Sequence, residues 1–323
     1  MKLDGIHHIT AITQDARENL DFYAGVLGLR LSGKGVNQDD PKHYHLYYSD
    51  DVGSPGSGLT FFEYRDALPS IAGPGMAHRI VWRVASDEAL DFWAERLTDA
   101  YVSFARGDSN LLFVDPEGLQ HQLSVYVGPD APLVPYHPDI PTQLALQGFD
   151  GVRTYSRNPE QSRRMIERLM GAEQVADRTW EIRGANRGGT IEIDPAPDHP
   201  GRQGAGSIHH VAWATTAEAH PSWDKSLTAA GIRTSGVIDR HWFHSIYFRE
   251  PGGVLFEIAD DEPGIAFEQE LGALGTKLLL PPWLEPRRSE IEGKLAPLPD
   301  PRDAWQPSEG SGASIRAIAA RPA

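Results

Sequence analysis

Two pairs of adjacent histidines are the residues of this sequence best suited to chemistry. The first pair lies in GIHHITAITQD, residues 5–15, and the second in GSIHHVAWATT, residues 206–216. Apolar and polar residues alternate through both stretches, as they do in a half-buried β-strand. Imidazole is a common ligand of transition metals and titrates near neutral pH. The repetition of the pair at two distant places predicts one site assembled from two copies of a structural unit.

The second histidine of each pair and one glutamate form a candidate metal-binding set. Alternation places His8 on one strand face with Thr10, and His210 on one face with Ala212. Glu257 lies in PGGVLFEIADD, in the same unit as His210. His8, His210 and Glu257 supply two imidazoles and one carboxylate and leave coordination positions open. Such a facial set is typical of non-haem iron(II) that binds substrate and dioxygen.

The alignment of the units leaves a fourth ligand open. The match of Gly58 with Gly253 places Phe62 at the position that Glu257 holds in the last unit. A shift of one residue places Glu63 there instead, which would give a closed site of two histidines and two glutamates, more like that of an isomerase. The plainer alternative is that a strand histidine is a hydrogen-bonded residue at a sheet edge.

One plan of elements recurs four times along the chain. Each unit begins with a strand, continues with a helix and ends in further strands. The units span about residues 5–64, 77–126, 149–194 and 207–260. At the position of the second histidine they carry His8, Arg79, Gly151 and His210. Metal-competent side chains therefore remain only in the first and last units.

This plan predicts an α+β fold of four βαβββ modules arranged as two tandem domains with cup-shaped mixed sheets. The expected divisions are 4–127 for the N-terminal domain with modules 1 and 2, 128–145 for a Pro-rich linker, 146–262 for the C-terminal domain with modules 3 and 4, and 263–323 for a C-terminal arm with a disordered tail. The metal is expected where the first and fourth units face each other.

Composition limits the classes of partner. The chain has 323 residues, a formal net charge of −15 and no cysteine. The charge argues against nucleic acid or an anionic membrane surface, and the absence of cysteine excludes thiolate ligands and disulfides. No apolar run approaches the ~18 residues of a membrane span. A cytoplasmic protein with a small-molecule ligand is therefore expected, and exposed sheet edges would allow a homo-oligomer.

The chain resembles the vicinal-oxygen-chelate superfamily of glyoxalases, bleomycin-resistance proteins and extradiol dioxygenases. Within it the chain is similar to ring-cleaving dioxygenases that open hydroquinones, from residue 4 to about residue 295. The stretches that carry this are HHITAIT, NLDFYAGVLGLRL, LTFF, SIHHVAWAT, DRHWFHSIYFREPGGVLFEIADDEPG and LGTKLLLPPWLEPRR. A metal ligand from the first unit, as His8 would be, is what the hydroquinone branch implies, because catechol enzymes take theirs from the C-terminal half.

The resemblance also implies catalytic residues around the metal: Arg240, Tyr247, His209, His7 and Thr10. The Tyr247 hydroxyl could hydrogen-bond a bound phenolate, and Arg240 could stabilise developing negative charge. His7 or His209 could act as acid or base, although strand alternation points both away from the metal face.

Aromatic residues near these stretches are candidates for the walls of the site. Phe61, Phe62, Trp242 and Phe243 could form an apolar cup. His43, His45, His241 and His244 crowd the same segments, and structural roles are equally expected for them.

The expected function is dioxygen-dependent cleavage of a small hydroquinone-type aromatic at Fe(II), with Mn(II) or another divalent metal as the alternative ion. A glyoxalase-like isomerase or lyase and a metal-free binding or resistance protein remain open, and so does a catechol substrate.

Overall fold

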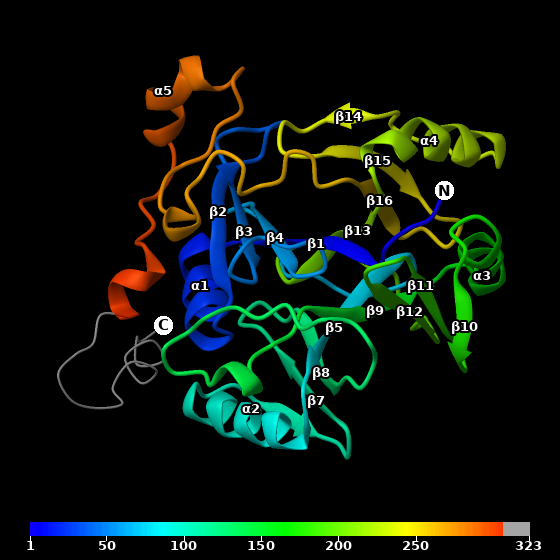
Figure 1. Ribbon diagram of the computed structural model, residues 1–323, viewed down its shortest axis with the longest axis horizontal. Coiled ribbons are helices and arrows are strands. Elements are labelled where there is room, and N and C mark those ends of the chain that lie inside the picture. The colour runs from blue at the N-terminus through cyan, green and yellow to red at the C-terminus, as the bar shows by residue number, and fades with distance from the viewer. Residues whose placement is uncertain (306–323) are drawn as a thin grey trace.

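The protein consists of four modules, each a strand, a helix and three further strands, and the computed structural model describes residues 1–305 (Figure 1). Module 1 contains β1 (Ile6–Thr13), α1 (Ala16–Leu20), a π-helical turn (Asp21–Val26), β2 (Arg30–Val36), β3 (Tyr44–Ser49) and β4 (Gly58–Glu63). Module 2 contains β5 (Met76–Val84), α2 (Asp87–Asp99), β6 (Phe104–Arg106), β7 (Asn110–Val114) and β8 (Gln120–Val125). Module 3 contains β9 (Phe149–Tyr155), α3 (Pro159–Arg168), β10 (Glu173–Ala176), β11 (Thr179–Arg183) and β12 (Gly188–Asp194). Module 4 contains β13 (Ser207–Ala214), α4 (His220–Ala229), β14 (Ile238–Asp239), β15 (His244–Arg249) and β16 (Leu255–Ala259). The predicted α+β fold of βαβββ modules is confirmed.

Side chains at the helix starts explain where several helices begin. Asp15, Ser86 and Asn158 each accept hydrogen bonds from backbone N–H groups of the first turn of α1, α2 and α3. These are favoured N-cap residues because their oxygens satisfy donors that have no partner within the helix. Gly28 follows the π-helical turn with φ +69°, and a Cβ there would collide with Ile140. Glycine is therefore required at the point where the chain leaves the helix.

Each module folds its strands into half a sheet. In module 1, β1 runs parallel to β4, while β2, β3 and β4 form an antiparallel meander. Module 4 repeats this arrangement with β13 parallel to β16. Two eight-stranded mixed sheets result, with the strand orders β14-β15-β16-β13-β1-β4-β3-β2 and β10-β11-β12-β9-β5-β8-β7-β6.

The modules do not pair in their order along the chain. Module 1 shares a sheet with module 4 through the antiparallel pair β1–β13, and module 2 shares the other sheet with module 3 through β5–β9. Each sheet therefore combines one module from either side of the linker. The predicted domain boundaries, 4–127 and 146–262, divide the chain by sequence and stay a prediction. The β1–β13 pair brings the two histidine pairs into neighbouring strands.

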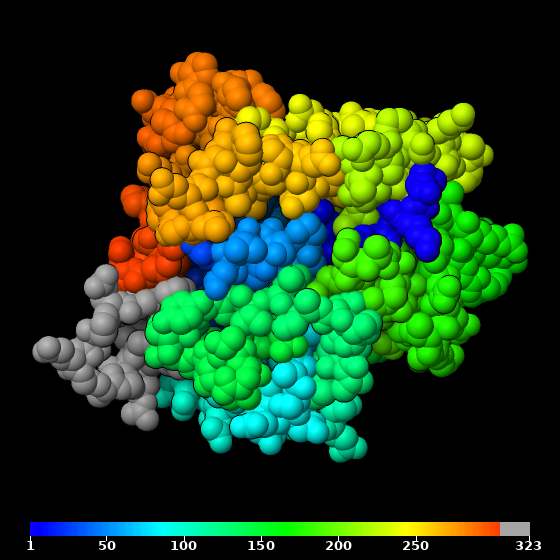
Figure 2. All heavy atoms as spheres, viewed as in Figure 1, coloured from blue at the N-terminus to red at the C-terminus, as the bar shows by residue number. Residues whose placement is uncertain are grey.

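The segment after β16 forms an arm against module 1. The backbone N–H of Leu279 donates to the Lys34 carbonyl on β2 over 2.7 Å, and the Tyr44 hydroxyl on β3 donates to the Ala296 carbonyl over 2.8 Å. The arm, drawn in orange, includes α5 (Arg288–Glu292) and packs directly against the blue strands of module 1 (Figures 1 and 2). The predicted tail, residues 306–323, lies outside the described residues. Within residues 1–305 no helix is long and apolar enough to span a bilayer.

Candidate metal centre

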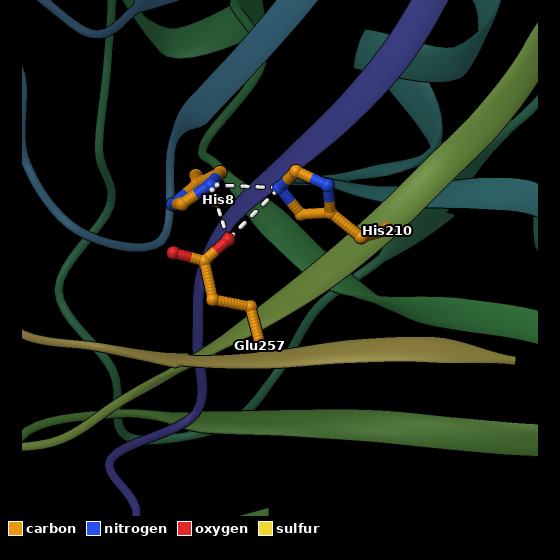
Figure 3. A group of neighbouring side chains, drawn as sticks. All are labelled: His8, His210 and Glu257. Atoms are coloured by element: carbon orange, nitrogen blue, oxygen red, sulfur yellow. Dashed lines mark hydrogen bonds and ion pairs between the residues drawn. The ribbon is translucent and has the colours of Figure 1, made fainter. Parts of the chain in front are cut away.

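Three ligand-capable atoms meet in the sheet that modules 1 and 4 share (Figure 3). Nε2 of His8 and Nε2 of His210 lie 3.3 Å apart. Oε2 of Glu257 lies 3.3 Å from the first nitrogen and 2.9 Å from the second. All three side chains are buried, Glu257 completely. In the part of the chain that the structure describes, this is the group of His, Asp and Glu side chains whose donor atoms could hold one metal ion.

Strand register explains why these residues converge. His8 on β1 pairs with Ala212 on β13, and Ala212 pairs with Glu257 on β16. Paired residues on neighbouring strands project to the same face of a sheet, so His8 and Glu257 flank an alanine whose methyl group leaves the space between them free. His210 precedes Ala212 by two residues and therefore projects to the same face.

The donor set fits a divalent metal. The Ser245 hydroxyl donates to Oε1 of Glu257 over 2.5 Å, which leaves Oε2 facing the two imidazoles. Burial opposes ionisation of Glu257, but the charges and hydrogen bonds of His8 and His210 hold its pKa well below the usual value. Burial lowers the pKa of His210, so its imidazole is neutral near pH 7. A carboxylate and neutral imidazole are the forms that bind metals.

Each ligand histidine contacts the histidine that precedes it. Nδ1 of His7 lies 2.9 Å from Nδ1 of His8, and Nδ1 of His209 lies 2.8 Å from Nδ1 of His210. A ligand histidine that offers Nε2 to a metal carries its proton on Nδ1 and donates it to the neighbouring ring. The neighbour then carries its own proton on Nε2, and Nε2 of His7 is buried without a hydrogen-bond partner. Simple alternation does not describe these contacts, and the β1–β13 register shifts beside both pairs, between Ile6 and His8 and between Thr10 and Ala11.

The two histidines that precede the ligand histidines, His7 and His209, are called the outer histidines, and both are neutral near pH 7. Burial, together with the charge of the adjacent ligand histidine, lowers the pKa of His7 and of His209 to about 3. A neutral imidazole offers one donor and one acceptor. Each outer histidine can therefore fix the tautomer of its ligand and still present an N–H elsewhere.

The other three predicted catalytic residues also lie around the centre. Thr10 Oγ1 is 2.8 Å from Thr60 Oγ1. The Tyr247 ring lies 5.5 Å from the His210 ring between centroids, and the Arg240 guanidinium lies 5.5 Å from the centroid of the Tyr247 ring. The fold thus gathers the residues that the resemblance implied, while their catalytic roles stay predictions.

The structural counterpart of Glu257 in module 1 is Thr60, not Phe62 or Glu63. Thr10 is equivalent to Ala212, because each follows a ligand histidine by two residues; Thr10 pairs with Thr60 as Ala212 pairs with Glu257. The alignment of Gly58 with Gly253 gave the wrong counterpart because the two glycines differ in position. Gly58 is the first residue of β4, whereas β16 begins two residues after Gly253.

Glu63 does not point toward the metal centre. Its Oε1 accepts a hydrogen bond from the backbone N–H of Ala16 over 3.4 Å, and its Oε2 lies 3.3 Å from Nε of Arg65. It is absent from the group of side chains that could share an ion. The described residues therefore offer three candidate metal ligands, His8, His210 and Glu257, and Glu63 does not add a fourth.

A small hollow, partly open to solvent, adjoins the centre on the module 1 side. Its lining includes His7, His8, Tyr47, Thr60 and Phe243. Imidazoles and hydroxyls thus share this space with an aromatic ring. Small-molecule sites typically combine aromatic walls with a few placed polar groups in this way.

The predicted apolar cup is correct only in part. Phe243 lines the hollow, and the Phe62 ring lies 5.6 Å from the His209 ring between centroids. Phe61 instead points to the opposite face of β4, where its ring centroid lies 4.6 Å from that of Tyr23 in the main core. Alternation along β4 is the reason, since Phe61 and Phe62 are adjacent.

Two residues beside the candidate metal centre were not predicted from the sequence. Tyr47 and Thr60 line the hollow, and His45 lies between them. Alternation along YHLYYS places His45 and Tyr47 on one strand face, and this pattern could have indicated that the two side chains lie together. Which face meets the metal, however, depends on the pairing of β3 with β4.

Comparisons with known proteins place the chain in a family. A model of the glyoxalase/bleomycin resistance protein/dioxygenase superfamily matches residues 5–118. MhqA of Bacillus subtilis, named as a candidate ring-cleaving dioxygenase, is 38% identical over 317 residues, covering 92% of this chain and all of its own. Chlorohydroquinone/hydroquinone 1,2-dioxygenase of Sphingobium indicum is 28% identical over 309 residues, covering 90% of this chain and 95% of its own.

Solved structures show the same relationship. The crystal structure of a candidate dioxygenase from Bacillus subtilis superposes with a TM-score of 0.86 at 35% identity, covering 93% of this chain and 98% of that one. Glyoxalase I from Zea mays, with a TM-score of 0.59 at 13% identity, shares the fold alone. The architecture is that of the glyoxalase superfamily. Within that superfamily, the chain belongs to the ring-cleaving dioxygenases and is an oxygenase enzyme.

Proposed function

We propose that this protein is an iron(II)-dependent dioxygenase that cleaves the ring of a hydroquinone-type aromatic. The observation that carries the proposal is the buried set of His8, His210 and Glu257 beside the hollow. Two imidazoles and one carboxylate with open positions are the facial arrangement of non-haem iron(II) oxygenases. When bound, the iron would supply Lewis acidity and the capacity to activate dioxygen toward a coordinated phenol.

The residues around the centre can hold a phenolic substrate. Burial raises the pKa of Tyr247, and the charge of Glu257 raises it further, so Tyr247 remains a neutral hydroxyl that can donate to a phenolate oxygen. The Arg240 guanidinium next to it places a positive charge on the same side. Such fixed donors and charges lower the energy of developing negative charge in a site shielded from water.

The two outer histidines are suited to hold or move a proton. His7 lines the hollow and carries an N–H on Nε2 when Nδ1 accepts from His8. His209 has the matching position beside His210. An N–H directed toward substrate can donate a hydrogen bond or a proton to an oxygen that becomes basic during ring opening.

The hydroquinone class rests on the similarity to the Sphingobium enzyme and on the polar groups of the hollow. That relative is named for chlorohydroquinone and hydroquinone. In this chain, Tyr47 and Thr60 add hydroxyl groups to a wall that also contains Phe243. A ring with one hydroxyl on the metal and another polar substituent would match such a lining.

Oxygen consumption tests this function directly. The protein would be purified without oxygen, loaded with Fe(II), and supplied with hydroquinone, methylhydroquinone or catechol. We expect oxygen uptake coupled to loss of the aromatic absorbance, strongest with a hydroquinone and absent in Glu257→Ala. Absence of uptake with every diphenol, despite one bound iron per chain, would overturn the proposal. Activity with Zn(II) and without oxygen would indicate an isomerase or lyase instead.

A further inference from the structure

A chain of buried polar side chains leads from the far wall of the hollow back to β1. The Tyr47 hydroxyl lies 2.7 Å from Nδ1 of His45, and Nε2 of His45 lies 2.9 Å from Thr60 Oγ1. Thr60 Oγ1 lies 2.8 Å from Thr10 Oγ1. At most 9% of the surface of any of these four residues is exposed.

The internal repeat of the fold gives this chain of residues a counterpart in module 4. Tyr47 pairs with Thr60 across β3 and β4, just as Tyr247 pairs with Glu257 across β15 and β16. His45 and Ser245 each precede the tyrosine by two residues, and each hydrogen-bonds the residue at the ligand position, Thr60 or Glu257. Module 1 thus presents a tyrosine to the centre in the same way as module 4, but without a metal-binding carboxylate.

Tyr47 is rigid and directed toward the site. Its ring packs in a small cluster with Trp242, Phe243 and Leu279, which restricts its rotamers. Burial raises the pKa of its hydroxyl. Tyr47 is therefore a neutral phenol in a fixed position.

The bond to His45 leaves the Tyr47 hydroxyl able to bind a ligand. Burial lowers the pKa of His45 well below its ordinary value, so the ring is neutral with one donor and one acceptor. If Tyr47 donates to Nδ1, its oxygen still accepts a hydrogen bond from a ligand. If Nδ1–H donates to Tyr47, the Tyr47 proton is free to be donated. Either tautomer leaves one hydrogen-bonding position on the hydroxyl.

We propose that Tyr47, oriented by His45 and Thr60, binds the hydroxyl group of the substrate that is remote from the metal. This inference rests on the proposed function and narrows the substrate to aromatics with a second hydroxyl group opposite the metal-bound one. His8 and Tyr47 line the same hollow, so a ring bound to the metal through one oxygen extends toward Tyr47. A para-diphenol offers an oxygen at that end. Catechol, with both oxygens at the metal end, leaves the second hydrogen-bonding position of the buried Tyr47 hydroxyl unfilled, which is unfavourable.

Anaerobic calorimetry on the Fe(II)-loaded enzyme would measure this recognition without turnover. The ligands are hydroquinone and 4-methylphenol, which share one phenol group and differ in the remote hydroxyl. We expect the wild type to bind hydroquinone about tenfold more tightly than 4-methylphenol, the range expected for one buried hydrogen bond. In Tyr47→Phe the ratio should fall to about one, chiefly through weaker hydroquinone binding.

Two further variants separate recognition from packing. Tyr44→Phe, on the same strand, loses a hydroxyl that donates to the Ala296 carbonyl outside the hollow, and it should keep the wild-type ratio. His45→Phe removes the group that orients Tyr47 and should reduce the ratio, with 4-methylphenol binding showing that the site is still folded.

The outcomes distinguish this inference from the proposed function. An unchanged ratio in Tyr47→Phe, or equal binding of both ligands by the wild type, overturns the role of Tyr47 even if oxygen uptake is normal. A ratio that depends on Tyr47 in a protein that consumes no oxygen would support the recognition and overturn the dioxygenase function.

Discussion

The Ser245 hydroxyl donates a 2.5 Å hydrogen bond to Oε1 of Glu257, and both residues are fully buried. This bond orients the carboxylate so that Oε2 alone meets His8 and His210. We expect Ser245→Ala to bind metal about 10- to 100-fold more weakly, as is typical when a partner of a metal ligand is removed. Competition with a chelator would measure the affinity. Ser207→Ala, which loses a buried bond to the Gly204 carbonyl, should retain wild-type affinity; an equal loss in both would refute the specific role of Ser245.

A second prediction separates the two buried glutamates. Glu257→Gln should reduce metal affinity by more than the ~100-fold effect of an outer-shell partner, because it removes a ligand. Glu63→Gln should retain the full metal content, since Glu63 contacts Ala16 and Arg65 instead. Metal analysis of both proteins after equal dialysis is the measurement. Loss of metal from Glu63→Gln would instead support the alternative in which Glu63 is a fourth ligand.

Tyr247→Phe should lower kcat about 100-fold if its hydroxyl stabilises charge on the substrate, the size of effect seen for a single oxyanion donor. The metal content should not change, because Tyr247 contacts the His210 ring without ligating. Oxygen uptake at saturating substrate and metal analysis on the same sample test both statements. A kcat within twofold of wild type would remove Tyr247 from the reaction.

Acid should destabilise the protein partly through His121. Trp82 Nε1 donates to Nδ1 of this buried histidine, so its Nε2–H donates to the Tyr23 hydroxyl, which in turn donates to Asp115. Burial lowers the pKa of His121 to about 3. Its contribution is complete above the unfolded value of ~6.5 and is lost as the pH falls from there toward 3.

The variant His121→Gln tests this contribution. Glutamine keeps a donor and an acceptor but does not titrate, so between pH 6 and 4 its free energy of unfolding should fall less steeply, by up to ~1.4 kcal/mol per pH unit. Urea denaturation at several pH values gives the slopes. His199→Gln, at an exposed histidine, is the control. Parallel pH curves for wild type and His121→Gln would contradict the assignment.

The linker is held by a buried ion pair that should be important for stability. Arg83 on β5 lies 2.7 Å from Asp130 in the linker and 3.1 Å from Asp150, and it donates to the Gly188 carbonyl. Arg83→Met should cost about 3–5 kcal/mol, because it leaves Asp150 and the Gly188 carbonyl without this buried donor, while Asp130 keeps its ion pair with Arg183. Chemical denaturation measures the loss. Arg164→Met, at an exposed pair with Glu160, should change stability by less than ~1 kcal/mol.

The sequence alone predicted the modules and the three candidate metal ligands. Strand alternation, helix caps and turn residues are local signals, so the four βαβββ units could be read directly. The two histidine pairs lay at matching places in the first and last units, and Glu257 was the carboxylate in a matching strand. The family resemblance pointed to the same three residues, which the structure brings together.

Only the tertiary structure decided which strands are neighbours and in which register. The β1–β13 pair joins residues about 200 positions apart, and nothing local specifies such a partner. The β1–β4 and β13–β16 pairs identify Thr60, rather than Phe62, as the counterpart of Glu257. The roles of His45 and Tyr47 were hidden for this reason too. Alternation fixes which residues share a face, but hydrogen bonds between distant strands decide what that face meets, and a shift of one residue reverses it.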